Sequence, residues 1–308
     1  MDCIKVFAPG TVANVACGFD VIGLAMDAPG DEMILRRSKE PGIRITAVHG
    51  ADLPLDPAKN VAGVAVQALL QKYDQPDTGI EIEIFKNIHP GSGIGSSAAS
   101  SAGAVVGVNH LLGEPFTRKQ LVRFAMEGER LASGSAHADN VAPAILGGFT
   151  MVRSYRPLDI ITLHSPAELW VTVIHPQIEV KTSDAREILK QKVLMTDAIR
   201  QWGNVGALVA GLFQEDYELI SRSLEDVIVE PVRSILIPAF HELKLKCKEA
   251  GALGGGISGS GPSVFMLSKG EANARKVAEM MDKVYAPLGV DYKIYVSQIN
   301  TAGVKVID

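Results

Sequence analysis

The sequence predicts an α+β protein, because strand and helix patterns follow one another irregularly rather than in a strict alternation. Residues 79–85 alternate apolar and acidic side chains, which is typical of a half-buried strand. Residues 117–129 have helical periodicity, and Thr117 followed by Gln120 forms a capping-box pattern at their start. These are the clearest strand and the clearest helix of the chain.

The other elements follow from hydrophobic periodicity and from turn residues. In the first half we expect strands over 4–8 (ended by Pro9-Gly10), 21–26, 33–37, 43–48 and 147–152, and helices over 60–73 and 98–112. In the second half we expect strands over 168–175, 263–267 and 291–296, and helices over 182–188, 193–213, 217–227, 238–250 and 271–285. An irregular, Pro-punctuated stretch between them predicts two domains, 1–155 and 156–308.

The composition describes a chain that can fold around a sizeable core. Of 308 residues, 47% are hydrophobic, and the formal net charge of −5 argues against a general nucleic-acid binder. No apolar run approaches the ~18 residues of a membrane span, and the N-terminus lacks the apolar stretch of a signal peptide. Three scattered cysteines form neither a disulfide framework nor a CxxC motif. We therefore expect a cytoplasmic protein whose partners include neither nucleic acid nor membrane.

The main functional feature is a glycine- and serine-rich segment, PGSGIGSSAASS over 90–101, between a predicted strand and a predicted helix. Glycines let backbone N–H groups approach a ligand, and a helix start adds unpaired N–H groups and a positive dipole end. The segment therefore predicts a phosphate-binding loop. It lacks the Gly-Lys pair of a Walker A loop, and Ser96 stands where G-x-G-x-x-G needs glycine. A flexible turn is the alternative, which the strand–turn–helix context disfavours.

Residues 90–98 (PGSGIGSSA) resemble the phosphate loop of the GHMP kinases, P-x-x-x-G-[LI]-G-S-S-A, with one residue fewer between the proline and the first glycine of the G-[LI]-G core. Two further regions are similar to this family and occur in the right order: APGTVAN at 8–14, followed by GFD at 18–20, and GGGISGSGPS at 254–263. The resemblance implies the GHMP kinase fold. That fold has an N-terminal lobe like ribosomal protein S5 domain 2, with a left-handed βαβ unit, and a C-terminal ferredoxin-like lobe.

Within this superfamily, several segments resemble the homoserine kinases. Residues 13–25 (ANVACGFDVIGLA), 137–150 (HADNVAPAILGGFT), 182–186 (TSDAR) and 230–233 (EPVR) carry this resemblance. It implies transfer of a phosphoryl group from ATP to the alcohol group of L-homoserine, which gives O-phospho-L-homoserine in threonine biosynthesis. It also implies a cytoplasmic homodimer that uses ATP with Mg²⁺.

The resemblance also assigns nucleotide and metal positions. Ser97 and Glu129 match the pair that holds Mg²⁺, although a solvated helix face would also explain Glu129. Asn60 and Lys86 match positions near adenine and ribose, where a helix cap and a strand-end lysine are the alternatives. ATP is further expected on the loop residues Pro90, Gly91, Ser92, Gly93, Ile94, Gly95, Ser96, Ser97, Ala98, Ala99 and Ser100.

The substrate-side positions that the resemblance implies are Asn14, Asp20, His137, Asp139, Arg186, Arg233 and Gly259. Arg186 and Arg233 suit an amino-acid carboxylate, because a guanidinium can hold it with two parallel hydrogen bonds. Two surface ion pairs are the alternative for these arginines. The asparagine, the aspartates, the histidine and the glycine have turn, capping or packing roles as their alternatives.

Asn140 stands where several other members of the superfamily carry an aspartate thought to act as a base. An amide cannot accept a proton at neutral pH, and phosphoryl transfer relies mostly on positioning and charge stabilisation. We therefore expect direct attack by the substrate hydroxyl, aligned by Asn14, Thr182 and Asn140. A carboxylate base at Asp139 is the alternative.

Two other functions remain open on sequence grounds. The first is a GHMP kinase for another small hydroxylated acid, such as mevalonate, against which the two arginines and the 137–150 segment speak. The second is a non-catalytic nucleotide-binding regulator built on the same fold. The presence of both Ser97 and Glu129 speaks against the regulator.

Overall fold

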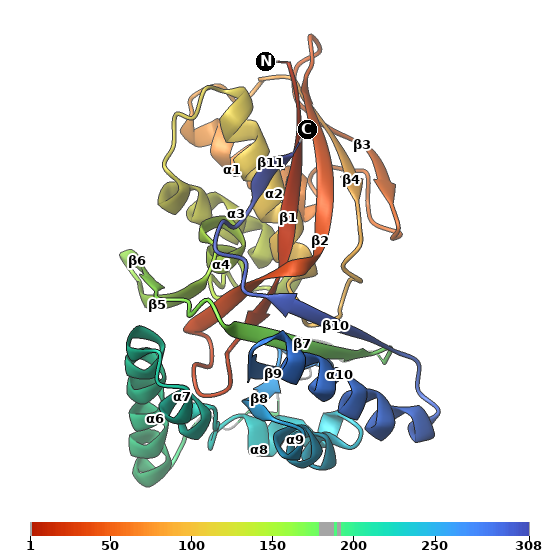
Figure 1. The fold of residues 1–308 in the computed structure, drawn as a ribbon. Helices are drawn as coiled ribbons and strands as arrows, with labels where there is room; N and C mark the ends of the chain where they lie inside the picture. Colours follow the sequence, from red (N-terminus) through yellow and green to blue (C-terminus); the bar gives the residue numbers. More distant parts are fainter. Residues whose placement is uncertain (1, 179–187, 190–191, 308) are drawn as a thin grey trace.

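The computed structural model describes residues 2–178, 188–189 and 192–307, and it contains two β-sheets with helices on their faces (Figure 1). The first sheet has seven strands in the order β11-β1-β2-β4-β3, with β5 paired to β2 and β6 paired to β5. Its strands are β1 (Cys3–Ala13), β2 (Ile22–Arg37), β3 (Ile43–His49), β4 (Ile80–Phe85), β5 (Phe149–Tyr155), β6 (Leu158–Leu163) and β11 (Lys305–Ile307).

Four helices cover one side of this sheet (Figure 1): α1 (Val61–Lys72), α2 (Ser96–Leu111), α3 (Arg118–Ser133) and α4 (Val141–Leu146). The strands β3 and β4 are parallel and are joined through α1, while the other pairs in the sheet are antiparallel. The expected caps at Asn60 and Thr117 are both present, the latter as a full capping box. Local capping chemistry therefore fixes where α1 and α3 begin.

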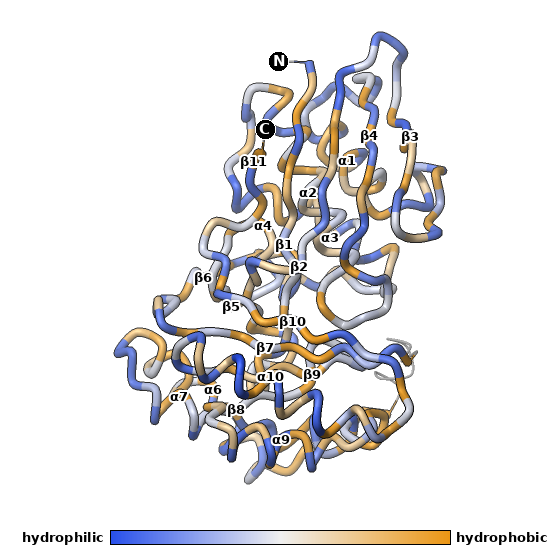
Figure 2. The backbone as a smooth tube through the Cα atoms, turned by 45° about the vertical axis from the view of Figure 1, so that its right-hand side comes forward, coloured by the Kyte–Doolittle hydropathy of each residue, from blue (hydrophilic) through white to orange (hydrophobic). Residues whose placement is uncertain are grey.

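The second sheet has four antiparallel strands in the order β10-β7-β9-β8. These are β7 (Leu169–Pro176), β8 (Ala252–Ile257), β9 (Val264–Lys269) and β10 (Tyr292–Gln298). Hydrophobic segments run through β7 and β10 (Figure 2). The helices of this half are α6 (Met195–Gln214), α7 (Tyr217–Ser223), α8 (Glu230–Arg233), α9 (Phe240–Glu249) and α10 (Glu271–Tyr285), with short 3₁₀ turns at Ser234–Leu236 and Ala286–Leu288.

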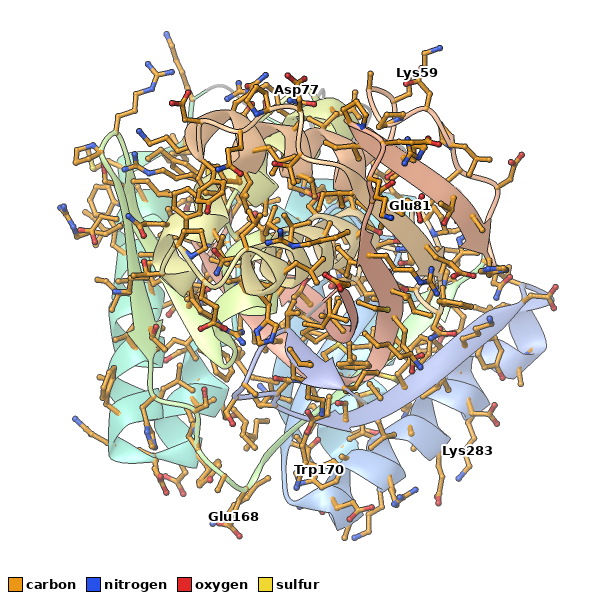
Figure 3. The ribbon with its side chains drawn as sticks, turned by 90° about the horizontal axis from the view of Figure 1, so that it is seen from above. Lys59, Asp77, Glu81, Glu168, Trp170 and Lys283 are labelled. Atoms are coloured by element: carbon orange, nitrogen blue, oxygen red, sulfur yellow. The ribbon has the colours of Figure 1, made fainter. Side chains whose placement is uncertain are left out.

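The chain order of this half is strand, helices, two strands, helix, strand, and its first strand lies beside its third and fourth. That is the ferredoxin-like arrangement, so the predicted two-lobed α+β fold is confirmed. Charged side chains such as Lys59, Glu168 and Lys283 lie at the margin of the molecule and point outward (Figure 3).

The predicted ends of the first strands were wrong. The strand β1 continues through Pro9-Gly10, where a register shift between Pro9 and Thr11 absorbs the irregularity. The two strands expected over 21–26 and 33–37 are one strand, β2, which pairs with β1 along its length. Tertiary pairing therefore keeps both proline–glycine steps in the sheet, where local turn signals predicted breaks.

Five strands and helices of the described residues were not predicted from the sequence: β6, β8, β11, α4 and α8. The strand β8 lies within a second glycine cluster, residues 251–261, whose many glycines do not show the apolar alternation that predicts a strand. A Cβ at Gly255 would lie 1.9 Å from the carbonyl oxygen of Phe265, so close strand approach requires glycine there. The helix expected over 217–227 ends earlier, at Ser223, and the helix expected over 182–188 lies outside the described residues, apart from Ile188.

The predicted division of the chain at 155/156 cuts the hairpin formed by β5 and β6. Both strands belong to the first sheet, and β11 near the C-terminus returns to pair with β1. The chain therefore passes to the second sheet after Leu163 and comes back before Lys305. A local proline signal cannot show this return, because the pairing of β11 is non-local.

The helix α2 lies in the middle of the first half and is buried on almost every side. Its alanines, serines and glycines allow this, because small side chains let neighbouring elements approach. A Cβ at Gly107 would lie 2.4 Å from Leu35, and one at Gly103 would lie 3.1 Å from Ala8 and from Met33. This packing fixes the start of α2, which carries the phosphate loop.

Candidate active site

A cleft of about 350 Å³ opens where the two halves meet. The phosphate loop, the segment after β1, the end of α3 and the loop before α4 line it from the first half. The second half contributes Arg233, Gly259 and Ser260. The sequence motifs from both halves therefore meet at one place.

The loop over 90–95 turns through three glycines, Gly91, Gly93 and Gly95. Their φ angles of 72–79° lie in the left-handed region, which favours glycine. Gly95 is the N-cap of α2 and gives it no side-chain cap, unlike the caps of α1 and α3. The first backbone bond of the helix runs from the Ala99 N–H to the Gly95 carbonyl. The N–H groups before Ala99 and the positive helix end therefore suit an anion in the cleft.

Two buried serines of the second half hold this loop from behind. Ser258 Oγ donates to the carbonyl oxygen of Gly93 at 2.7 Å, and Ser263 Oγ donates to that of Ser92 at 2.6 Å. In a trans peptide the N–H points opposite to the C=O. Holding these two carbonyls toward the second half therefore directs the N–H groups of Gly93 and Ile94 away from it.

Lys86 lies in a buried ion pair with Asp31. Its ammonium also donates to the Ser96 carbonyl at 2.9 Å and to Ser100 Oγ at 3.0 Å, at the start of α2. Burial lowers the pKa of Lys86, and the charge and hydrogen bond of Asp31 oppose that shift. Asp31 also accepts from the N–H groups of Asn87 and Ile88, at 2.9 Å each. Lys86 reaches the cleft wall, but its described contacts support the loop.

Asn60 is engaged as a helix cap. Its Oδ1 accepts from the Ala62 N–H at 3.0 Å, and its Nδ2 donates to the Pro54 carbonyl at 2.8 Å. The neighbouring Val61 lines the cleft, together with Leu53 and Ala132. The described contacts of Asn60 are therefore those of a helix cap, which was the alternative role. A contact of Asn60 with the nucleotide stays a prediction.

Ser97 and Glu129 meet at the cleft wall, from the start of α2 and from the C-terminal half of α3. Burial raises the pKa of Glu129 to about 7, although a hydrogen bond with Ser97 opposes the shift. Among the described residues, Glu129 Oε1 is buried without a hydrogen-bond partner. A hydroxyl and a carboxylate oxygen in need of a positive partner fit Mg²⁺, which takes few protein ligands beside water and substrate phosphates.

Asn14 joins the two halves at the cleft. Its Nδ2 donates to the Gly259 carbonyl at 2.7 Å, and its Oδ1 accepts from the Asp20 N–H at 3.1 Å. Asn14 has a φ of 72° and Asp20 a φ of 59°, so the turn between them holds strained backbone that both side-chain types tolerate. Asn14 is therefore both a turn former and a cleft residue.

Asn140 lies at the start of α4, and its Oδ1 accepts from Thr11 Oγ1 at 2.7 Å. This bond leaves the amide nitrogen as the group that can face a substrate, and that group is a donor. Asp139 is buried beside it and also lines the cleft. The carboxyl group next to the amide is therefore Asp139.

Arg233 is buried at the end of α8, so it is not an exposed surface arginine. Its guanidinium donates to the Gly259 carbonyl at 3.4 Å and lies 5.1 Å from the ring centroid of Phe19. His137 lies across the cleft, with Nδ1 3.8 Å from Asp20 Oδ1. Thr182 and Arg186 lie outside the described residues.

Residues 60–148 match the N-terminal domain of the GHMP kinases, and residues 207–287 match their C-terminal domain. The chain belongs to the GHMP kinase family. As a member of this family, the protein is a kinase that uses ATP. The two matched regions contain the phosphate loop with Glu129, and Arg233 with the second glycine cluster.

Relatives of this GHMP kinase are similar to it over most of its length. It is 50% identical to a homoserine kinase of Chloroherpeton thalassium, over 91% of each chain. It is 47% identical to a homoserine kinase of Chlorobium phaeobacteroides, with all of both chains covered. The crystal structure of a homoserine kinase from Cytophaga hutchinsonii is 52% identical, covers 100% of this chain and 98% of its own, and superposes with a TM-score of 0.96.

No local sequence pattern marks Asp31, Thr11, Ser258 or Ser263 of this kinase as functional residues. Thr11, Ser258 and Ser263 lie within the quoted motifs, and that position was the only available signal. Asp31 follows a proline–glycine step and reads as a turn residue. No helix in the described part of the chain is long and apolar enough to span a bilayer.

Proposed function

We propose that this GHMP kinase transfers the γ-phosphoryl group of ATP to the hydroxyl of L-homoserine, giving ADP and O-phospho-L-homoserine in threonine biosynthesis. The observation that carries the proposal is the buried Arg233 across one cleft from an uncapped, glycine-built phosphate loop. A cation there matches an amino-acid carboxylate. The homoserine kinases that cover all or nearly all of the chain support the same substrate.

The phosphate loop and its supports bind the triphosphate of ATP. The uncapped start of α2 lines the cleft, and the serines behind the loop fix the direction of the N–H groups of Gly93 and Ile94. Leu53, Val61 and Ala132 supply apolar surface for the base. Because these groups are held before the substrate arrives, little reorganisation accompanies the reaction.

Ser97 and Glu129 would hold the Mg²⁺ that accompanies ATP, since both line the cleft and Glu129 Oε1 is buried without a described hydrogen-bond partner. The bound ion would neutralise phosphate charge. Metal binding requires the carboxylate form of Glu129, and its pKa of about 7 places that ionisation near neutral pH.

L-Homoserine is held by Arg233 through its carboxylate and by the opposite wall of the cleft through its amino and hydroxyl groups. Asp20, His137 and Asp139 are polar side chains that line the same cleft, and Gly259 adds backbone groups. Arg186 would be the second carboxylate ligand and Thr182 a third group that aligns the hydroxyl. Both assignments rest on the motif resemblance alone.

The hydroxyl attacks directly, aligned by Asn14, Asn140 and Thr182, without an asparagine acting as base. The bond from Thr11 Oγ1 to Asn140 Oδ1 supports this, because it leaves the Asn140 amide nitrogen as a donor. An Asp139→Asn variant tests the alternative. If it lost turnover while keeping its affinity for both substrates, a carboxylate base at Asp139 would be the better account.

The enzyme works in the cytoplasm as a homodimer, with neither nucleic acid nor membrane as partner. The net charge of −5 supports the exclusion of nucleic acid. The cysteines support a reducing compartment, since Cys17 and Cys247 are buried and unpaired.

The test is ADP release from Mg-ATP with L-homoserine, L-serine, L-threonine, mevalonate and galactose as separate acceptors. We expect strong turnover with L-homoserine alone. Turnover with mevalonate would refute the carboxylate argument and keep the kinase assignment. ATP binding without turnover on any acceptor would favour a nucleotide-binding regulator. An Arg233→Lys variant is the matched control for acceptor binding, because it keeps the charge and changes the geometry.

A further inference from the structure

The helix α6 has two apolar faces, and among the residues that the structure describes only one of them packs against the rest of the chain. Ala198, Leu208 and Leu212 are buried on its inner face. On the other side an outer stripe, defined as Met195, Ile199, Trp202, Gly206 and Phe213, recurs at spacings of four, three, four and seven residues. That spacing places all five on one side of a helix, as in the seam of a coiled coil.

The outer stripe is exposed to a degree that is unusual for such side chains. The exposed fractions are 66% for Met195, 58% for Ile199, 63% for Trp202 and 58% for Phe213. Figure 1 shows α6 at the outer edge of the second half, with α7 on its inner side. Contiguous exposed apolar surface of this kind marks an interaction site rather than ordinary solvent-facing surface.

We propose that the outer stripe of α6 packs antiparallel against the same stripe of a second copy of this chain, across a two-fold axis near Asn204. This inference specifies the surface of the homodimer proposed above, and it rests on that part of the proposed function. A two-fold axis brings the same patch of each copy together, so the patch must complement itself.

The stripe complements itself in shape. An antiparallel pairing about Asn204 places Trp202 opposite Gly206 of the partner subunit, and Met195 opposite the partner's Phe213. A Cβ at Gly206 would meet nothing within 4 Å, so the helix surface there is open to a large side chain. The bulkiest residue of the stripe therefore meets its smallest one twice, once on each side of the axis. Glycine destabilises an exposed helix, and close packing against the partner's Trp202 accounts for a glycine at position 206.

The ends of the pairing complement each other in charge. The same alignment places the exposed Lys192, just before α6, near the C-terminal end of the partner's α6. Glu215 and Asp216 follow that end directly, and the helix dipole adds negative charge there. Between the ends, the five residues of the stripe carry no charge.

The exposed apolar area supplies a substantial part of what a stable interface needs. An aromatic side chain buries roughly 150–250 Å², so the exposed parts of Trp202 and Phe213 alone supply roughly 200–300 Å² per copy. A standard interface takes about 800 Å² from each partner. Met195, Ile199 and the preceding exposed Val193 and Leu194 extend the patch toward that value.

The test is sedimentation velocity on the full chain across a range of concentrations. We expect a dimer for the unmodified protein and at least a tenfold higher dissociation constant for Trp202→Glu. Leu245→Glu is the matched control, because Leu245 is a 59% exposed apolar residue on α9, away from α6. We expect that control to remain dimeric.

A residue exchange tests the register. Trp202→Gly removes the large side chain and Gly206→Trp fills the recess, so each variant alone should weaken the dimer at least tenfold. The double variant W202G/G206W restores a large residue opposite a small one and should recover most of the affinity. Circular dichroism of each variant confirms that the helix content is kept.

A monomeric unmodified protein, or a dimer that Trp202→Glu leaves intact, would overturn the inference. A double variant that dimerises more weakly than both single variants would also overturn it. Binding of the stripe to another protein or to a membrane would not depend on the pairing of Trp202 with Gly206, so the exchange would then restore nothing. Kinase turnover is measured separately on the same samples. An active monomer refutes only the dimer surface, whereas a dimer without homoserine turnover refutes only the proposed reaction.

Discussion

Ser258 of the second half donates a hydrogen bond to the carbonyl oxygen of Gly93, in the phosphate loop of the first half, at 2.7 Å. A Cβ at Gly93 would lie 2.7 Å from the Ser258 carbonyl, so the two segments are in close backbone contact as well. Gly259, the next residue, accepts from Asn14. One short loop therefore fixes the phosphate side and the substrate side of the cleft together.

We predict that Ser258→Ala and Ser263→Ala each raise the KM for ATP about five- to tenfold and leave the KM for homoserine nearly unchanged. A single hydrogen bond contributes about 1 kcal/mol, which corresponds to that factor. Steady-state kinetics with each substrate varied separately measure the effect. Ser268→Ala is the matched control, because Ser268 is equally buried and its hydroxyl has no partner among the described residues. An equal rise in that control would refute the loop-positioning argument.

We predict that Glu129→Gln stabilises the metal-free protein at pH 8 and has little effect at pH 5. The folded-state pKa of Glu129 is raised to about 7, so its stability contribution is fully present below about 4.5 and is lost as pH rises through 7. Above that pH the buried carboxylate costs on the order of 1–3 kcal/mol, which a neutral amide avoids. Thermal unfolding of both proteins without metal measures the difference.

The same variant is expected to lose the stabilisation that Mg²⁺ with ADP gives the parent protein. Equal stability of parent and variant at pH 8 without metal would contradict the raised pKa. A variant that Mg²⁺ with ADP still stabilises as much as the parent would contradict the metal assignment.

We predict that Arg233→Lys raises the KM for homoserine about ten- to hundredfold and leaves the KM for ATP within about twofold. Lysine keeps the charge but cannot hold a carboxylate with two parallel bonds or lie over the Phe19 ring as a planar group. Charge-assisted hydrogen bonds of this kind contribute about 1.5–3 kcal/mol. Arg275→Lys, in an exposed pair with Glu271, is the control and should change neither constant. A rise confined to the KM for ATP would place Arg233 on the nucleotide side.

We predict that Lys86→Met and Asp31→Asn each lower the free energy of unfolding by about 3–5 kcal/mol, since each leaves its buried partner without a counter-charge. The double variant should be less destabilised than the sum of the two, because it leaves no unpaired charge. Urea unfolding measures all three. If Lys86→Met instead weakened ADP binding with unchanged stability, the nucleotide contact predicted from its motif position would be the correct role.

The sequence by itself determined the phosphate loop, the two capped helices and the membership of a kinase family. These depend on local chemistry: glycines that allow left-handed turns, side chains that cap helix N–H groups, and apolar residues with a regular period. Arg233 was also recognisable, although only its segment EPVR marked it.

Only the tertiary structure decided what the candidate residues contact. Lys86 is buried against Asp31, which lies 55 positions away in the chain, and Asn140 accepts from Thr11, which lies 129 positions away. The return of β11 to the first sheet and the continuation of β1 and β2 through proline–glycine steps are likewise products of pairing. These features depend on which distant groups the fold brings within hydrogen-bond reach. The residues that adjoin a position in the chain do not specify those distant groups.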